Sequence, residues 1–211
     1  VFVELGGRLD YNTASGESTS ALFLPKVGLS YNISDHSFFK SSSISQILSS
    51  VKLRANYGEA TNYAGAFSSE RTFALESFLG APALRFSNPG NPDLKSEIVQ
   101  TTEFGLELGF LDNRINLSGT YYKGITKDAL FTPTQPPSSG LLNQIQNIGE
   151  IENTGYELAI NANIIQKNSH NLDISVSYNK NENTVSSMGG AAPFVVGGFT
   201  VIGSWVEEGQ S

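Results

Sequence analysis

The sequence predicts an all-β protein that forms part of an antiparallel, up-and-down β-barrel crossing a membrane. Three observations support this fold class. Seven stretches of the 211 residues alternate between apolar and polar side chains, which is the period of a β-strand with two different faces. The apolar face of each stretch lacks charged residues. The connections between the stretches alternate between long and short, as in barrels of the outer membrane.

The seven alternating runs are close to the length of about 9–11 residues that a tilted strand needs to cross a bilayer. They lie near residues 1–11, 22–33, 50–59, 99–111, 114–126, 154–165 and 172–183. The first three carry apolar residues at Val3, Leu5, Leu9; Val27, Leu29, Tyr31, Ile33; and Val51, Leu53, Ala55, Tyr57. Their alternate positions are polar: Glu4, Arg8, Asp10, Lys26, Asn32, Lys52, Arg54 and Asn56.

The fourth and fifth runs form a predicted hairpin around Asp112-Asn113, a pair of residues typical of tight turns. One face carries Phe104, Leu106, Leu108, Phe110, Ile115, Leu117 and Tyr121, and the other carries Glu103, Glu107, Asn116 and Ser118. The last two runs repeat this pattern. Their apolar residues are Tyr156, Leu158, Ile160, Ala162, Ile164, Leu172, Ile174, Val176 and Tyr178, and their polar ones include Glu157, Asn161, Asn163, Asp173, Ser175 and Ser177.

Alternation by itself does not say whether the apolar face meets lipid or the dry core of a soluble β-sandwich. The connections favour a barrel. The odd-numbered connections, near 12–21, 60–98, 127–153 and after 183, share one end and are mostly long. The even-numbered ones, near 34–49, 112–113 and 166–171, share the other end, and two of the three are short. A sandwich has no reason to sort its loops in this way.

Aromatic residues gather at the long-loop end of the apolar face, as expected of rings at a membrane interface. They are Tyr11, Tyr57, Tyr121, Tyr156, Tyr178 and Phe23. A Lys or Arg at the middle of the lipid-facing surface costs about 2–4 kcal/mol, which explains the uncharged face. The opposite face would line a wet lumen, and its candidate lining residues are Arg54, Glu103, Glu107 and Glu157.

Seven strands are too few for such a lumen, so the chain is expected to be one segment of a larger barrel of about 22 strands. The sequence opens inside a strand and has no initiating Met, which also suggests an internal segment. The net charge of −7 and the lack of a basic patch argue against a nucleic-acid partner, and the absence of cysteine excludes disulfides.

Five motifs in order resemble the barrel region of SusC/RagA-type TonB-dependent outer-membrane transporters. They are FLPKVGLSYNIS (23–34), SVKLRANYGEATN (50–62), NPDLKSE (91–97), TEFGLELGFLDNRINLSGTYYKGITKDALF (102–131) and NIGEIENTGYEL (147–158). The resemblance implies that residues 1–211 are a partial barrel domain without the N-terminal plug. It also implies an importer of oligosaccharides or peptides in the bacterial outer membrane, with a SusD-like surface lipoprotein as partner. In this family the contact with the TonB complex lies in the N-terminal region, which nothing here matches.

The long connection near 60–98 contains aromatic residues that could stack on sugars or pack on a partner, although such residues more often hold a long loop together by packing on each other. These candidates are Tyr63, Phe67, Phe73, Phe78 and Phe86. The stretch NPGNPDLKSE reads as a rigid turn before the strand at 99–111. Glu103, Glu107 and Glu157 are expected to belong to a hydrated wall, with Arg54 or Arg114 as possible ion-pair partners.

No catalytic residue, cofactor site or metal site is predicted. His36 and His170 share no ligand spacing with each other or with an acidic cluster, and no nucleophile–base set or phosphate-binding loop is present. The alternative that remains open is a soluble β-sandwich, such as a carbohydrate-binding module. An enzyme on a β scaffold is not favoured by any motif.

Overall fold

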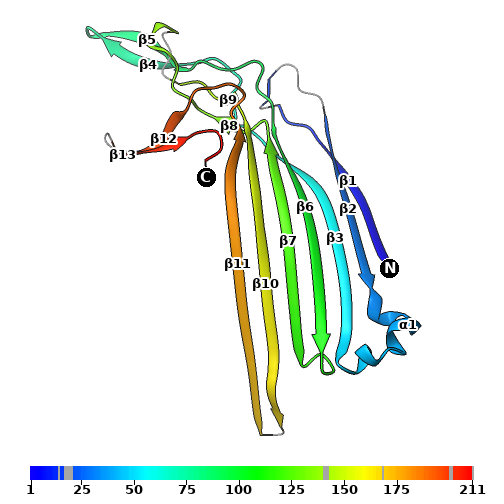
Figure 1. The fold of residues 1–211 in the computed structure, drawn as a ribbon. Coiled ribbons are helices and arrows are strands. Elements are labelled where there is room, and N and C mark those ends of the chain that lie inside the picture. Colours follow the sequence, from blue (N-terminus) through cyan, green and yellow to red (C-terminus); the bar gives the residue numbers. More distant parts are fainter. Residues whose placement is uncertain (14, 17–20, 140–142, 168, 200–201, 211) are drawn as a thin grey trace.

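Seven long strands form one antiparallel sheet in the computed structural model, which describes residues 1–13, 15–16, 21–139, 143–167, 169–199 and 202–210 (Figure 1). Each strand pairs with the next one in the order β1-β2-β3-β6-β7-β10-β11. The strands are β1 (Phe2–Asp10), β2 (Leu22–Asn32), β3 (Leu48–Asn62), β6 (Glu97–Phe110), β7 (Ile115–Lys127), β10 (Glu150–Lys167) and β11 (His170–Ser187). They correspond one to one with the predicted runs, and the antiparallel all-β fold class is confirmed.

Several short elements interrupt the connections, and the sequence did not predict them. They are β4 (Thr72–Phe78) with β5 (Ala81–Asn88), β8 (Leu130–Phe131) with β9 (Gln146–Asn147), β12 (Phe194–Phe199) with β13 (Ile202–Val206), and the helical turns η1 (Ile33–Asp35), α1 (Ser37–Lys40), η2 (Ser43–Gln46) and η3 (Pro137–Ser139). Parts of the connections predicted near 12–21 and 127–153 lie outside the described residues. Within the part that is described, every helix is too short and too polar to span a membrane.

The register of the sheet places apolar residues opposite apolar residues. Leu53 stands opposite Leu106, Leu108 opposite Leu117, and Leu117 in turn opposite Ile160. Directly opposed residues of an antiparallel pair point to the same side of the sheet. The separate apolar sets of the seven strands therefore merge into one continuous apolar face, and the polar sets merge into the other face.

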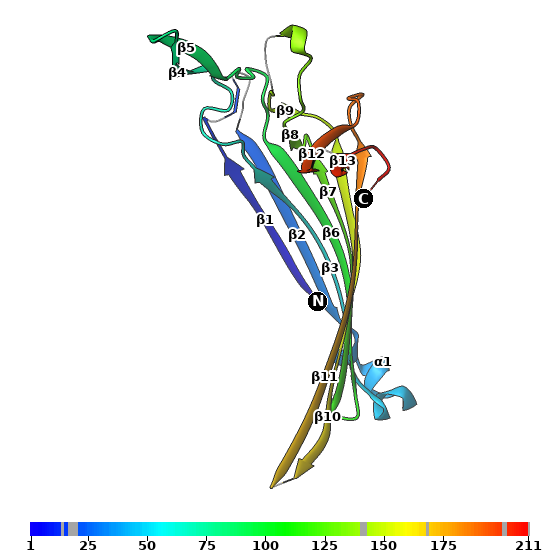
Figure 2. The same ribbon diagram turned by 90° about the vertical axis from the view of Figure 1, so that its left-hand side faces the viewer.

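The sheet is a single curved layer (Figures 1 and 2), and within the described residues no second sheet covers its apolar face; the small β12–β13 sheet contacts it at Val185, near the end of β11. Leu5 is 74% exposed, Leu9 71% and Val176 58%. The sandwich alternative required these side chains to interleave between two sheets, so the structure does not support it. A small hydrophobic cluster forms instead beyond the strand ends, where Met188, Phe194 and Val206 are buried together.

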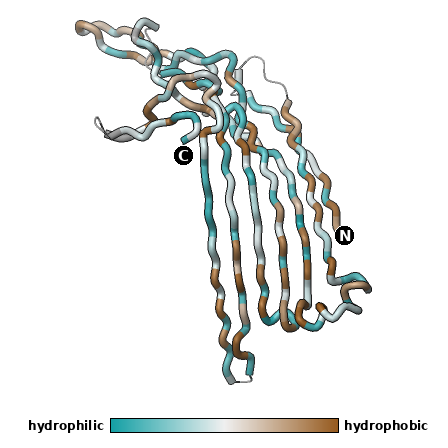
Figure 3. The backbone as a smooth tube through the Cα atoms, in the orientation of Figure 1, coloured by the Kyte–Doolittle hydropathy of each residue, from teal (hydrophilic) through white to brown (hydrophobic). Residues whose placement is uncertain are grey.

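Hydropathy changes along the strands (Figure 3). The apolar positions of β10 and β11 lie in the half nearest the short turns, and the half nearest the long connections is polar. Both strands contain 18 residues, more than the predicted runs and more than the length of about 9–11 residues that a crossing needs. We call the two ends of the sheet the loop end, with the long connections, and the turn end.

One register shift corrects the predicted apolar set of β10. Between Asn163 and Ile165 the pairing skips a residue, so that Leu172 stands opposite Ile165 and not Ile164. This is a β-bulge, in which one extra residue interrupts the ladder. The side chain of Arg114 stabilises it, because Nη2 donates to the carbonyl oxygens of Asn163 at 3.2 Å and Ile164 at 3.1 Å.

Candidate functional site

The polar face carries a network around Glu107, one of the predicted lining residues. Its carboxylate accepts a hydrogen bond from Lys52 Nζ at 3.4 Å and lies 3.6 Å from Arg54 Nε. The Nη2 atom of Arg54 donates to Thr120 Oγ1 at 2.8 Å. The network therefore ties together β3, β6 and β7. Because these groups are more than a third exposed, each ion pair contributes little, on the order of 0.2–1 kcal/mol.

Glycines on the polar face make room for long polar side chains of the neighbouring strand. A Cβ atom on Gly105 would lie 2.2 Å from Arg54 Nε, and one on Gly155 would lie 2.4 Å from the hydroxyl of Tyr122. Each long side chain thus lies flat across a glycine on the paired strand. Tyr122 uses this position to donate from its hydroxyl to Asn181 Oδ1 at 3.0 Å, one strand further on. The sequence analysis missed these pairs, because they become visible only with the register.

The other predicted wall residues are less connected. Glu103 and Glu157 also lie on the polar face, but neither takes part in an ion pair within the described part of the chain. Arg114, which was a possible partner for the glutamates, binds the bulge of β10 instead. That expectation was therefore wrong for Arg114. The assignment of Arg54, Glu103, Glu107 and Glu157 to a lumen wall stays a prediction.

The apolar face ends in tyrosines and then in charged pairs toward the loop end. The rings of Tyr121 and Tyr156 lie 5.3 Å apart between centroids. Further toward the loop end on the same face, Lys123 lies two residues beyond Tyr121 and Glu152 lies four residues from Tyr156, and Lys123 Nζ is 2.8 Å from Glu152 Oε2. The same order occurs in other strands, with Tyr57 followed by Glu59 and Tyr178 followed by Lys180 and Glu182. An apolar zone, a tyrosine row and a charged row in succession are typical of a membrane interface.

A loop junction, residues Asn91–Glu97, gathers the long connections at the loop end. The Asn91 side-chain oxygen accepts a hydrogen bond from the backbone of Asp93 at 3.1 Å, which makes a local turn. The amide group of the same side chain donates to the carbonyl of Ile145 at 2.9 Å. Leu94 is fully buried, and its carbonyl accepts from the backbone N–H of Gly16 at 2.8 Å.

Asn147 and Glu97 complete this junction. The Asn147 side chain accepts from the backbone N–H of Lys95 at 2.7 Å and donates to the carbonyls of Lys95 and Asp128, both at 2.8 Å. The Glu97 carboxylate accepts from the backbone N–H of Leu130 at 2.6 Å. The predicted turn is present, but it does more than lead into a strand. It fastens three connections to one another and so fixes the shape of the loop end.

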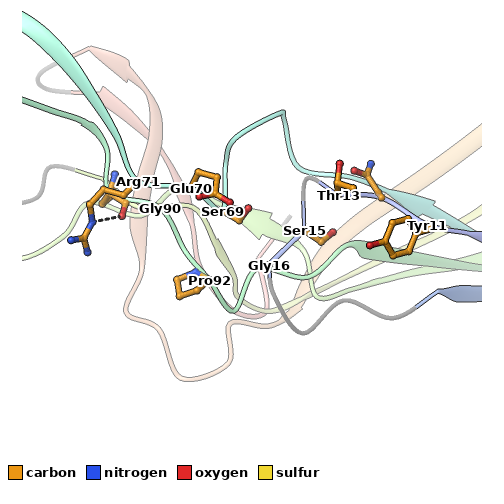
Figure 4. Close-up of a pocket in the computed structure, with 11 residues that line it drawn as sticks. Tyr11, Thr13, Ser15, Gly16, Ser69, Glu70, Arg71, Gly90 and Pro92 are labelled. Carbon is orange, nitrogen blue, oxygen red and sulfur yellow. Dashed lines mark hydrogen bonds between the residues drawn. The ribbon is translucent and has the colours of Figure 1, made fainter.

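A cavity of about 470 Å³ lies beside the loop junction (Figure 4). Gly90 closes one side with φ of +72°, and a Cβ atom there would lie 2.8 Å from the backbone nitrogen of Arg71, so only glycine fits. The Arg71 side chain donates from Nε to the carbonyl of Pro89 at 3.5 Å. Tyr11, which was expected at the membrane interface, borders this cavity. The other lining residues are mainly polar and include Thr13, Ser69 and Glu70.

The candidate aromatic residues of the 60–98 connection mostly lie on the β4–β5 hairpin. Phe73 and Phe86 face each other with ring centroids 4.9 Å apart, and the Arg71 guanidinium lies 5.5 Å from the Phe86 centroid. Phe67 and Phe78 are 69% and 68% exposed, so mutual packing holds for only one pair of the set. Tyr63 lies apart from them. Burial and the nearby Asp10 carboxylate raise the pKa of its phenol.

One face of the hairpin carries four large apolar side chains, and Phe78 lies at the tip of the other face. The register places Phe73 opposite Phe86 and Leu75 opposite Leu84, and all four side chains are 44–78% exposed. The other face carries an ion pair between Arg85 Nε and Glu76 Oε1 at 2.6 Å. Figure 2 shows the hairpin leaning to the opposite side of the sheet from α1.

Comparisons with known proteins agree with this architecture. The family described as "TonB dependent receptor-like, beta-barrel" matches residues 1–203. TonB-dependent receptor P39 of Formosa agariphila is 30% identical over 97% of this chain and 19% of its own length. TonB-dependent receptor SusC of Bacteroides thetaiotaomicron is 30% identical over 79% of this chain and 17% of its own.

Among solved structures, the RagAB peptide transporter superimposes with a TM-score of 0.85 at 26% identity, over 99% of this chain and 23% of that chain. The RagAB importer in its "open-open" state gives a TM-score of 0.82. The chain thus spans about a fifth of the length of the curated relatives that it matches. The family match over residues 1–203 and the open seven-stranded sheet show that this chain belongs to the TonB-dependent receptor-like β-barrel family.

Proposed function

We propose that this chain is a wall segment of a nutrient importer in the bacterial outer membrane. The observation that carries this proposal is the uncovered apolar face of the single-layer sheet, which ends in tyrosines and then in charged pairs. Water is a poor solvent for such a face, whereas acyl chains and headgroups match its zones. In the seven-stranded sheet, β1 and β11 are the edge strands, and each pairs on one side only. A closed barrel of about 22 strands would supply hydrogen-bond partners for both edges.

The polar face lines the lumen in this proposal. Arg54, Glu103, Glu107 and Glu157 then belong to a hydrated wall, and the glycine positions keep the long side chains flat against it. The energy for import comes from the TonB complex, through parts of the protein that precede a barrel in this family. The cargo is an oligosaccharide or a peptide. The match to structures described as a peptide importer supports the second of these.

The apolar face of the β4–β5 hairpin supports a protein partner above the lumen. An isolated two-stranded hairpin is marginally stable in water, and one that exposes Leu75 and Leu84 needs a cover. The hairpin stands at the loop end of the sheet (Figure 1), where a surface lipoprotein of the SusD type would sit over the barrel mouth. We assign the apolar face of the β4–β5 hairpin to the contact with this lipoprotein. We assign the cavity beside Arg71 to the mouth of the barrel, where the cargo enters.

The proposed function is tested by removing the full-length protein from its host and measuring uptake. The deletion strain is expected to lose uptake of one class of labelled cargo, peptides or oligosaccharides, and a strain without TonB is expected to lose the same class. Both losses should be restored by the matching gene. Unchanged uptake of both classes in the deletion strain would contradict the proposal.

A further inference from the structure

The connection between β2 and β3, residues 33–47, is unlike the tight turn at 111–114 at the same end of the sheet. It forms three helical turns, η1, α1 and η2, and exposes large apolar side chains. Phe38 is 63% exposed, Ile44 60% and Ile47 63%. A connection of two to five residues would suffice to join two antiparallel strands. The extra length and the exposed apolar groups therefore call for a physical reason.

A column of rings joins this connection to the apolar face of the sheet. Tyr31 lies on that face, because it stands opposite Leu53. Its ring centroid lies 5.3 Å from that of His36, and the His36 ring stacks on Phe38 at 5.7 Å with 19° between the planes. The connection is thus continuous with the apolar face, and Figure 2 shows α1 standing out from one side of the sheet.

Several backbone carbonyls of this connection accept hydrogen bonds from within it. Lys40 N donates to the carbonyl of His36 at 3.1 Å, and Ser41 donates to the carbonyl of Ser37 from both its N–H, at 3.0 Å, and its hydroxyl, at 2.8 Å. The Ser45 hydroxyl donates to the carbonyls of Ser42 at 2.8 Å and Lys40 at 3.1 Å. Water would serve these groups equally well at a solvated turn. Internal pairing matters where water is scarce, as in the lipid interface.

The apolar face beside Tyr31 is hollowed. Ala55 stands between Leu29 and Phe104 in the register, and its small side chain leaves an open apolar hollow of about 620 Å³. Tyr31 and Leu53 also line it. A hollow of this chemistry holds hydrocarbon more favourably than water. The surface next to the connection therefore matches acyl chains. This favours lipid as the molecule that also contacts the exposed apolar side chains of the connection.

We propose that residues 33–47 form an interfacial anchor in the periplasmic leaflet of the outer membrane, because the turn end of an outer-membrane barrel lies on the periplasmic side. Phe38, Ile44 and Ile47 enter the boundary between headgroups and acyl chains, and the polar Asp35 and Lys40 remain in the headgroup layer. The occupant of this surface is the lipid of that leaflet. The inference rests on the proposed function, since it needs the apolar face of the barrel to lie in a bilayer, and short amphipathic segments bind such interfaces through buried apolar area.

The test places single tryptophans in the full-length protein, reconstituted in phosphatidylethanolamine vesicles with plain or brominated acyl chains. Phe38→Trp and Ile47→Trp probe the anchor. Ile174→Trp, on the apolar face of β11, and Ser177→Trp, on its polar face, are matched references. The unsubstituted protein supplies the background fluorescence, and migration of the unheated protein on a gel verifies that each variant folds.

The anchor tryptophans are expected to be quenched by brominated lipid about as strongly as Ile174→Trp and several times more strongly than Ser177→Trp. Quenching of Phe38→Trp and Ile47→Trp no greater than that of Ser177→Trp would overturn the anchor. Aqueous acrylamide then separates the two ways of failing: access indicates a solvated turn, and protection from both quenchers indicates a second protein. If Ile174→Trp itself escapes the lipid quencher, the barrel assignment fails rather than the anchor alone.

Discussion

The side chain of Arg54 lies across Gly105 on the neighbouring strand, where a Cβ atom would come within 2.2 Å of Arg54 Nε and 2.6 Å of Arg54 Cγ. Gly105 therefore holds a place for the guanidinium beside Glu107, on the polar face of the sheet. The relationship links residues 51 positions apart in the sequence, through the pairing of Arg54 with Gly105 in β3 and β6.

Replacing this glycine should disturb the wall. Gly105→Ala is expected to push Arg54 away from Glu107 and to destabilise the folded full-length barrel by about 0.2–1 kcal/mol, which is the contribution of an exposed ion pair. The effect is measured as the temperature of sample heating at which the band of the folded protein disappears from the gel. Gly58→Ala is the control, because a Cβ atom there meets only Lys26 Cβ at 4.0 Å. If the folded band of both variants disappeared at the same temperature, Gly105 would not be needed to make room for Arg54.

The lipid-facing assignment predicts a contrast between the two faces of β6. Leu106→Arg places a charge on the apolar face and is expected to impair barrel assembly by about 2–4 kcal/mol if it lies near mid-membrane. Glu103→Arg, on the polar face, should be tolerated. Glu107→Arg is a poorer control, because it would place a third cation beside Lys52 and Arg54. The folded fraction in outer-membrane preparations distinguishes the outcomes, and equal assembly of both variants would count against the orientation.

The hairpin face predicts loss of a partner without loss of the barrel. Leu75→Asp combined with Leu84→Asp removes the centre of the apolar face and is expected to weaken co-purification of the surface lipoprotein by tenfold or more, about 1.4 kcal/mol. The double variant Glu76→Ala with Arg85→Ala, on the opposite face, should retain binding. Gel migration of the unheated protein should stay normal in both. Full binding by the aspartate variant would exclude this face as the contact.

The loop junction predicts a local effect of Asn147. Asn147→Ala removes the side chain that bonds the backbone of Lys95 and Asp128, and the three lost hydrogen bonds, which are exposed or half-buried, cost about 0.5–1.5 kcal/mol each. Protease added to intact cells is therefore expected to cut near 127–153 faster than in the unsubstituted protein. Lys95→Ala keeps every backbone bond of the junction and should not change the rate. An unchanged rate for Asn147→Ala would show that the other junction bonds suffice.

The β4–β5 hairpin and the bulge of β10 were missed for different reasons. The β4–β5 hairpin escaped prediction because its alternation breaks at Ser77 opposite Pro82, and its turn contains Leu79 at a φ of 54° before Gly80. The Leu79-Gly80 pair between two short apolar runs was the signal that could have revealed it. The bulge at Ile164 was not predicted because the local sequence Ala-Asn-Ile-Ile contains no signal for an extra residue.

The alternation of the sequence by itself determined the seven strands, the uncharged character of one face and the sorting of long and short connections. These are local properties: a period of two fixes the side on which each residue lies, whatever strand comes next. The tertiary structure decided the side-chain contacts between distant residues, which depend on the register and the order of strand pairing. Arg54 crosses Gly105, Asn147 fastens the loop junction, and Phe38 continues the ring column from Tyr31, because each depends on which distant residues the pairing brings together.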